Sequence, residues 1–215
     1  MLSALNYYSR IRFITNLLPL LQYAPGLRRV VFVAGGSKEG PLDPTDFQAL
    51  RIPFASIRGH LTSLVSLGLE TVAKSAPDVS FIHDYPGTVK TTLLSRMPGM
   101  RGLYIRSLVW LLGYWICVPI EESGERHLYL ATSAKFPPLS GRSNTAVSLG
   151  DRIDIAKGMT GRIGSGVYSV GWDCESSPPA VLELLAGFRD RGMVEEVWRH
   201  TEGEFKRIME EDGNL

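Results

Sequence analysis

The stretch RRVVFVAGG, residues 28–36, decides the fold. Residues 30–33 form a short apolar run rich in β-branched side chains, with two arginines before it and two glycines after it. An apolar run without polar alternation is typical of a strand buried on both faces, as in a parallel sheet. We therefore predict a buried parallel strand at this position.

Segments with helical and strand-like patterns alternate around this strand. Apolar residues recur at helical spacing in the helical segments, and the remaining strands are short apolar runs. Such alternation predicts an α/β fold, a parallel sheet with helices on both faces. The predicted helices are 2–22, 56–74, 103–118, 121–132, 181–188 and 194–209, and the predicted strands are 30–33, 79–83 and 167–170.

Length and composition favour one globular domain over residues 1–215, with a long loop or insertion at 137–164. A net charge of +1 provides no field to recruit nucleic acid or an anionic membrane. The longest apolar run, residues 108–120, is too short to span a bilayer, and two distant cysteines favour a reducing compartment. We expect a cytoplasmic protein without a membrane span or a nucleic-acid partner.

Several segments together resemble the short-chain dehydrogenase/reductase family, in a divergent branch common in fungi. The likeness covers most of the chain, and its segments are 5–9 and 17–21 (a helix), 29–33 (the fifth strand), 85–91 (the Pro-Gly loop after the sixth strand) and 121–133 (a late helix). The resemblance implies a Rossmann-like, doubly wound sheet. It also implies NAD(P) as cofactor and a small carbonyl or alcohol substrate, in secondary metabolism.

The resemblance also implies roles for individual residues. Asn6 matches the family asparagine of a proton relay, and Ser37 stands in for the catalytic serine only after a loop shift. Arg58 replaces the catalytic lysine, whereas Phe54 falls where the family has its proton-donating tyrosine. The family positions that contact the cofactor are Pro86, Gly87, Thr88 and Thr91.

The family's glycine-rich turn, TGxxxGxG, is not found in this sequence. That turn lets backbone amides approach a diphosphate at a helix N-terminus. We expect the first strands and this turn to be missing ahead of residue 2, so that the chain alone does not hold NAD(P). A sheet that lacks its first strands exposes an edge, which predicts self-association.

Further candidates come from the residues themselves. His60, near a helix start, is either a replacement acid/base or a structural helix histidine. Asp84 and Tyr85 follow a strand, at the end where ligands bind in such sheets, so Tyr85 is a candidate displaced acid. The glutamates of 121–125 lack clustered histidines, so no metal site is expected.

Three hypotheses follow. The chain is an oxidoreductase of the short-chain type, or a noncatalytic relative that acts as a binding or partner module. The third is a redox-neutral isomerase or cyclase that uses His60, Asp84 and Tyr85 in the old substrate pocket.

Overall fold

The structure, a computed structural model, describes residues 3–89, 99–100, 102–104, 107, 111, 113, 117–141, 145–150 and 153–212. Three parallel strands form one sheet in the order β1-β2-β3. The strands are β1 (Arg29–Val33), β2 (Ser80–Asp84) and β3 (Val167–Val170). The helices are η1 (Ala4–Tyr8, a π-helix), α1 (Ser9–Tyr23), α2 (Phe54–Ser75), α5 (Ile120–Thr132), α6 (Pro179–Asp190) and α7 (Met193–Asp212).

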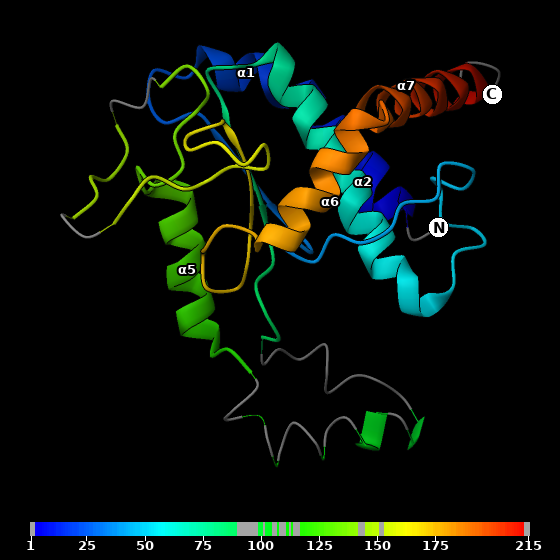
Figure 1. Ribbon diagram of the computed structural model, residues 1–215, viewed down its shortest axis with the longest axis horizontal. Coiled ribbons are helices and arrows are strands. Elements are labelled where there is room, and N and C mark those ends of the chain that lie inside the picture. Colours follow the sequence, from blue (N-terminus) through cyan, green and yellow to red (C-terminus); the bar gives the residue numbers. More distant parts are fainter. Residues whose placement is uncertain are drawn as a thin grey trace.

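Helices cover both faces of the sheet (Figure 1). Phe81 of β2 points toward α1, α2, α6 and α7, in a core that also contains Phe32 and Leu64. The next residue along the strand, Ile82, points to the opposite face, where it packs in a smaller core with Leu130 of α5. Because successive side chains of a strand point to opposite faces of the sheet, the strands contribute residues to both cores. The predicted α/β fold with helices on both faces is confirmed.

Proline determines where three helices begin. Pro53, Pro119 and Pro178 stand at the N-caps of α2, α5 and α6. A fixed φ and the lack of an N–H group cost little at a helix start, where that N–H has no partner inside the helix. Between α6 and α7 the chain turns at Gly192, whose φ of 71° favours glycine.

The elements agree with the predicted ones to within a few residues at each end. Strand β3 begins and ends as predicted, and α2 begins two residues earlier than predicted, at Phe54. The predicted helix at 2–22 is divided into a π-helix and an α-helix. The predicted helix at 103–118 lies largely outside the described residues. None of the described helices has the length and apolar character needed to cross a bilayer.

The outer edge of β1 is open among the described residues, because β1 pairs only with β2. Beside it lies a groove of about 920 Å³ between α1 and β1. Apolar side chains of α1 line it, including Phe13 and Leu17, which are 66% and 41% exposed. An edge strand next to exposed apolar side chains is a surface on which another strand can pair.

Candidate functional site

The three strands end together at one edge of the sheet. Val33 of β1 is level with Asp84 of β2, and Asp84 is level with Val170 of β3. The segments that leave the strands at this edge include Ser37 and residues 85–88, most of the predicted site residues. Ligands of open parallel sheets bind beyond the carboxyl edge, which makes this edge the candidate site.

Buried polar side chains fix the loop that follows β1. Glu39 Oε1 accepts hydrogen bonds from Ser66 Oγ of α2, at 2.7 Å, and from Ser169 Oγ of β3, at 2.6 Å. The backbone N–H of Ser37 donates to Ser169 Oγ at 2.7 Å. Ser66 Oγ also lies 2.9 Å from His83 Nδ1 of β2. One buried network therefore ties the loop to two strands and a helix.

The hydrogen bonds fix the direction of each proton in this network. Gly35 N–H donates to His83 Nε2 at 3.2 Å, so the imidazole carries its proton on Nδ1 and donates to Ser66. Burial lowers the pKa of His83 to about 3, which agrees with a neutral ring. Burial also raises the pKa of Glu39, although the hydroxyls of Ser169 and Ser66 act in the opposite direction. The network anchors the loop to β2, β3 and α2.

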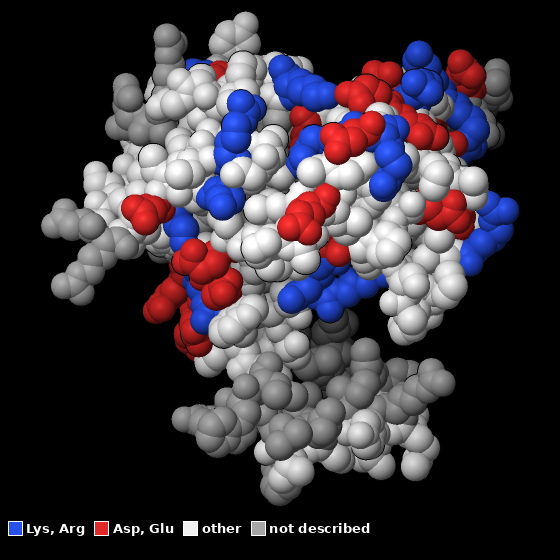
Figure 2. Space-filling view, in the orientation of Figure 1, with Lys and Arg blue, Asp and Glu red and all other residues white. Residues whose placement is uncertain are grey.

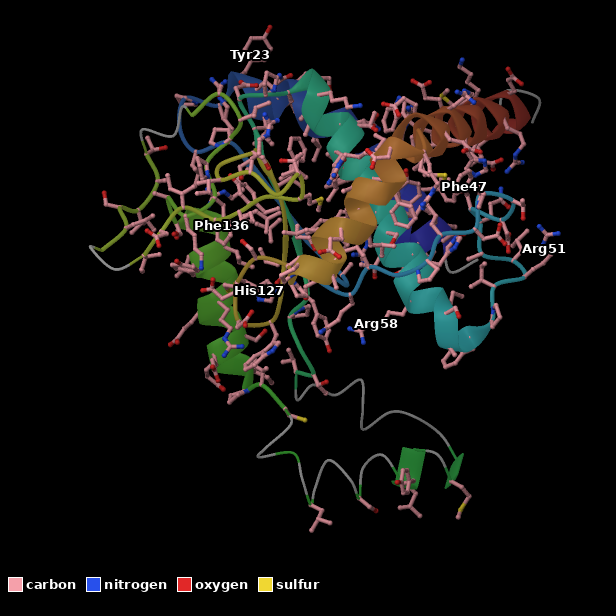
Figure 3. The ribbon with its side chains drawn as sticks, in the orientation of Figure 1. Tyr23, Phe47, Arg51, Arg58, His127 and Phe136 are labelled. Atoms are coloured by element: carbon pink, nitrogen blue, oxygen red, sulfur yellow. The ribbon has the colours of Figure 1, made fainter. Side chains whose placement is uncertain are left out.

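Tyr85 lies at the same edge with two cations against its ring. The Arg58 guanidinium, from the first turns of α2, is 4.6 Å from the ring centroid, and the Lys38 Nζ is 5.8 Å from it. Tyr85 is half-buried, and both cations are exposed. Figure 3 shows Arg58 near the middle of the view, below α6. Three separate segments thus bring a phenol and two positive charges together.

A second pair of ionisable groups lies on the other face of the sheet. The buried carboxylate Asp84 Oδ2 is 3.1 Å from His127 Nε2 of α5. Figure 3 shows His127 on α5, toward the lower edge of the sheet. Burial raises the pKa of Asp84 to about 6, while His127 opposes this shift. Among the described residues, no three His, Cys, Asp or Glu side chains gather as a metal site would require.

His60 and Asn6 do not join Tyr85 in any described contact. His60 is 1% exposed, and its Nδ1 accepts from the Asp43 N–H at 3.3 Å. Its Nε2 lies 3.4 Å from the Phe47 carbonyl, so both ring nitrogens serve the loop before α2. Asn6 lies half-buried in the π-helix η1. Phe54, at the position of the family tyrosine, is 88% exposed at the start of α2.

The predicted cofactor loop is only partly described. Pro86, Gly87 and Thr88 follow β2, whereas Thr91 lies outside the described residues. Gly87 has a φ of 79°, and a Cβ there would lie 3.0 Å from Val118. The glycine is therefore required by close packing within the protein.

The described glycines at this edge do not fit a diphosphate. A cradle for a dinucleotide needs glycines whose open side faces the ligand. A Cβ on Gly35 would lie 2.4 Å from Thr62 Oγ1, and one on Gly36 would lie 2.1 Å from the His83 carbonyl oxygen. Protein atoms fill the space beside each of these glycines. Gly35 and Gly36 therefore leave no open backbone for the diphosphate of NAD(P).

Sequence reasoning missed Lys38, Glu39 and His127. Lys38 stands in a loop whose path only the folded structure defines. A signal for the buried network was present in His83, a polar residue beside the apolar Phe81 and Ile82 of one short strand. Buried polar side chains are nearly always hydrogen-bonded, so their partners could have been sought among the serines of α2.

Comparison with known proteins finds similarity to fungal proteins that are named as oxidoreductases or reductases. No family model matches the sequence. An oxidoreductase of Emericella nidulans is 39% identical over 204 residues, which are 94% of this chain and 60% of the relative. The NmrA-like family domain-containing oxidoreductase notO of an Aspergillus species is 33% identical, over 93% of this chain and 55% of the relative. A short-chain dehydrogenase/reductase of Stachybotrys chartarum is 30% identical, over 91% and 55% respectively.

These relatives carry oxidoreductase names, and one carries the short-chain name that the sequence resemblance suggested. The similarity extends along nearly the whole chain. The chain is therefore a relative of fungal oxidoreductases, and it spans 55–60% of the length of these relatives.

Proposed function

We propose that the chain forms the substrate-binding part of an oxidoreductase of the short-chain type. Its substrate is the carbonyl or alcohol group of a small organic molecule, in the secondary metabolism that the resemblance implies. The observation that carries the proposal is Tyr85, which stands at the carboxyl edge of the central strand with Arg58 and Lys38 against its ring.

In this proposal the Tyr85 phenol holds the proton that a carbonyl oxygen gains when the carbonyl is reduced. A phenol is a suitable general acid, and it must come within about 3 Å of the substrate oxygen. Phe54 has no such proton to give. Tyr85 therefore takes the place of the tyrosine that the family carries on the helix after its fifth strand.

The glycines after β1 are not assigned to binding of the NAD(P) diphosphate. Gly35 and Gly36 face protein atoms, so their backbone is closed to a diphosphate. Pro86, Gly87 and Thr88 remain as contacts for the nicotinamide end. A bound nicotinamide would supply the redox chemistry, while Tyr85 would hold the proton.

One observation favours the second candidate, a noncatalytic relative. Ser37 is buried, and its backbone is tied to Ser169, so the family serine has no obvious stand-in facing the ligand. The redox-neutral hypothesis has less support, because Asp84 faces His127 and both ring nitrogens of His60 face the loop. Of the three groups proposed for the redox-neutral reaction, Tyr85 remains as a candidate.

A truncated reductant tests the proposed function. Because TGxxxGxG is not found in this sequence and Gly35 and Gly36 leave no open backbone for a diphosphate, 1-benzyl-1,4-dihydronicotinamide should serve this chain at least as well as NADPH. With the neutral ketone methyl benzoylformate, the wild-type chain should form one enantiomer of methyl mandelate in excess. The readout is chiral chromatography of the product.

The variant Tyr85→Phe keeps the aromatic ring and removes the proton, so we expect the enzymatic rate to fall by about 100-fold. Tyr23→Phe is the matched control, because Tyr23 is 86% exposed at the end of α1. Racemic methyl mandelate at the uncatalysed rate from the wild-type chain would refute the proposed function and favour the noncatalytic relative.

A further inference from the structure

Lys38 and Arg58 form a pair of positive charges that no carboxylate neutralises among the described residues. The side chain of each contacts the ring of Tyr85, and neither takes part in a described ion pair. The loop's own Glu39 turns inward to Ser66 and Ser169. Figure 2 shows Lys and Arg side chains together near the middle of the view, at about the height where Figure 3 labels Arg58.

Arg58, the fifth residue of α2, adds a positive charge close to the positive end of the helix dipole. Arg58 stands in the early turns of α2, where the helix dipole is positive and acidic side chains are preferred. The first turn of α2 contains no acidic residue, and its N-cap, Pro53, makes no side-chain capping bond. A bound negative group would compensate both the helix end and the guanidinium.

The backbone beneath Lys38 is strained and firmly held. Ser37 has a φ of 62°, in the left-handed region, which costs a residue other than glycine on the order of 1 kcal/mol. The bond from the Ser37 N–H to Ser169 keeps this conformation in place, as does the bond from the Lys38 N–H to the Gly35 carbonyl, at 3.0 Å. Strain that the surroundings maintain is common at ligand sites.

From these three observations we infer that Lys38 and Arg58 bind the negative group of the substrate, a small organic carboxylate, beside Tyr85. The inference rests on the proposed function, because it names the substrate class of the same site. Lys38 supplies a point charge, and Arg58 supplies a fork of donors that matches the two oxygens of a carboxylate. The reacting carbonyl or alcohol then lies toward the Tyr85 hydroxyl.

The experiment compares two probes that differ in charge and hardly in shape. Benzoate and benzamide are titrated into the full chain at low ionic strength, and binding is followed by saturation-transfer NMR. We expect benzoate to bind at least about tenfold more tightly than benzamide, and Lys38→Gln/Arg58→Gln to remove that preference. The matched control is Arg199→Gln/Lys206→Gln, which removes two exposed cations of α7 and should keep it.

Adenosine 2′,5′-bisphosphate is the third probe, because phosphates of a nucleotide are the other anions that such cations can bind. Equal binding of benzoate and benzamide overturns the inference. So does a stronger, Lys38- and Arg58-dependent binding of the bisphosphate. The assay for methyl mandelate uses a neutral ketone and does not depend on the two cations. If its product is racemic while benzoate binding still depends on charge, the proposed function is refuted and the inference about Lys38 and Arg58 is not.

Discussion

Asp84 Oδ2 lies 3.1 Å from His127 Nε2, so a buried carboxylate at the end of the central strand faces an imidazole of α5. The Ser123 carbonyl oxygen, 2.6 Å from His127 Nδ1, can only accept a hydrogen bond. Nδ1 therefore carries a proton, and any proton between Nε2 and Oδ2 is held jointly by the pair. The contact joins the sheet to the helix that covers its second face.

Stability should depend on pH through this contact. Burial raises the pKa of Asp84 from 3.8 to about 6, so the folded state binds this proton more tightly than the unfolded state. The stability that protonation contributes is present at low pH and is lost as the pH rises through this range. Asp84→Asn cannot ionise, so its free energy of unfolding relative to wild type should rise by about 2 kcal/mol between pH 4.5 and pH 7.

Urea titrations at the two pH values measure this difference. Asp190→Asn removes an exposed carboxylate at the end of α6 and should follow the wild type at both. Parallel curves for Asp84→Asn and wild type would show that Asp84 titrates with an ordinary pKa.

Loss of Ser169 should loosen the loop that carries Lys38. Ser169→Ala leaves the Ser37 N–H without its acceptor and Glu39 with one donor fewer, in a buried position. We expect a loss of about 1–3 kcal/mol in the free energy of unfolding, measured by urea denaturation. Ser9→Ala, which removes an exposed hydroxyl bonded to its own helix turn, should change stability little. An unchanged midpoint in Ser169→Ala would mean that water replaces the hydroxyl.

Two glycines give opposite predictions for the same substitution. Gly36→Ala drives a methyl group into the backbone of two strands, 2.1 Å from the His83 carbonyl oxygen and 2.7 Å from that of Val170. We expect insoluble or unfolded protein. Gly203→Ala, in α7 with no atom within 4 Å of the new carbon, should stabilise by roughly 0.5–1 kcal/mol. A soluble Gly36→Ala chain with the wild-type melting temperature would contradict this account of the loop.

The groove between α1 and the open edge of β1 predicts self-association. Light scattering coupled to gel filtration should give an average mass above that of a monomer, rising with concentration. Phe13→Glu should lower this mass, because Phe13 lines the groove and is 66% exposed. Leu128→Glu is the control, since Leu128 is as exposed but lies on α5. A wild-type chain that remains monomeric at every concentration would exclude this contact.

Periodicity was sufficient for the fold. The apolar run at 30–33 and the helical spacing at 56–74 depend on short-range patterns, and both segments formed as predicted. Such patterns cannot show the π-helix that includes Asn6, because its five residues form about one turn and are too few to establish a period. Such patterns also locate helix ends poorly. The predicted start of α2 was residue 56, whereas the helix begins at Phe54, directly after a proline.

The candidate site was only partly predictable. Tyr85 could be located, because it directly follows a strand. Its contacts with Lys38 and Arg58 join residues 27 to 47 positions away, and these depend on the path of the loop after β1. His60 looked available because helical spacing does not show that the loop folds back over it. Long-range contacts of this kind follow from packing, which one sequence does not reveal.

The most direct measurement is a calorimetric titration of NADPH into the 215-residue chain. We predict no saturable binding in the submillimolar range, because the glycine-rich turn TGxxxGxG is not found in this sequence. Gly35 and Gly36 cannot replace it, since protein atoms fill the space beside both. Saturable submillimolar binding by these residues alone would contradict this prediction, and would mean that the chain holds its own cofactor.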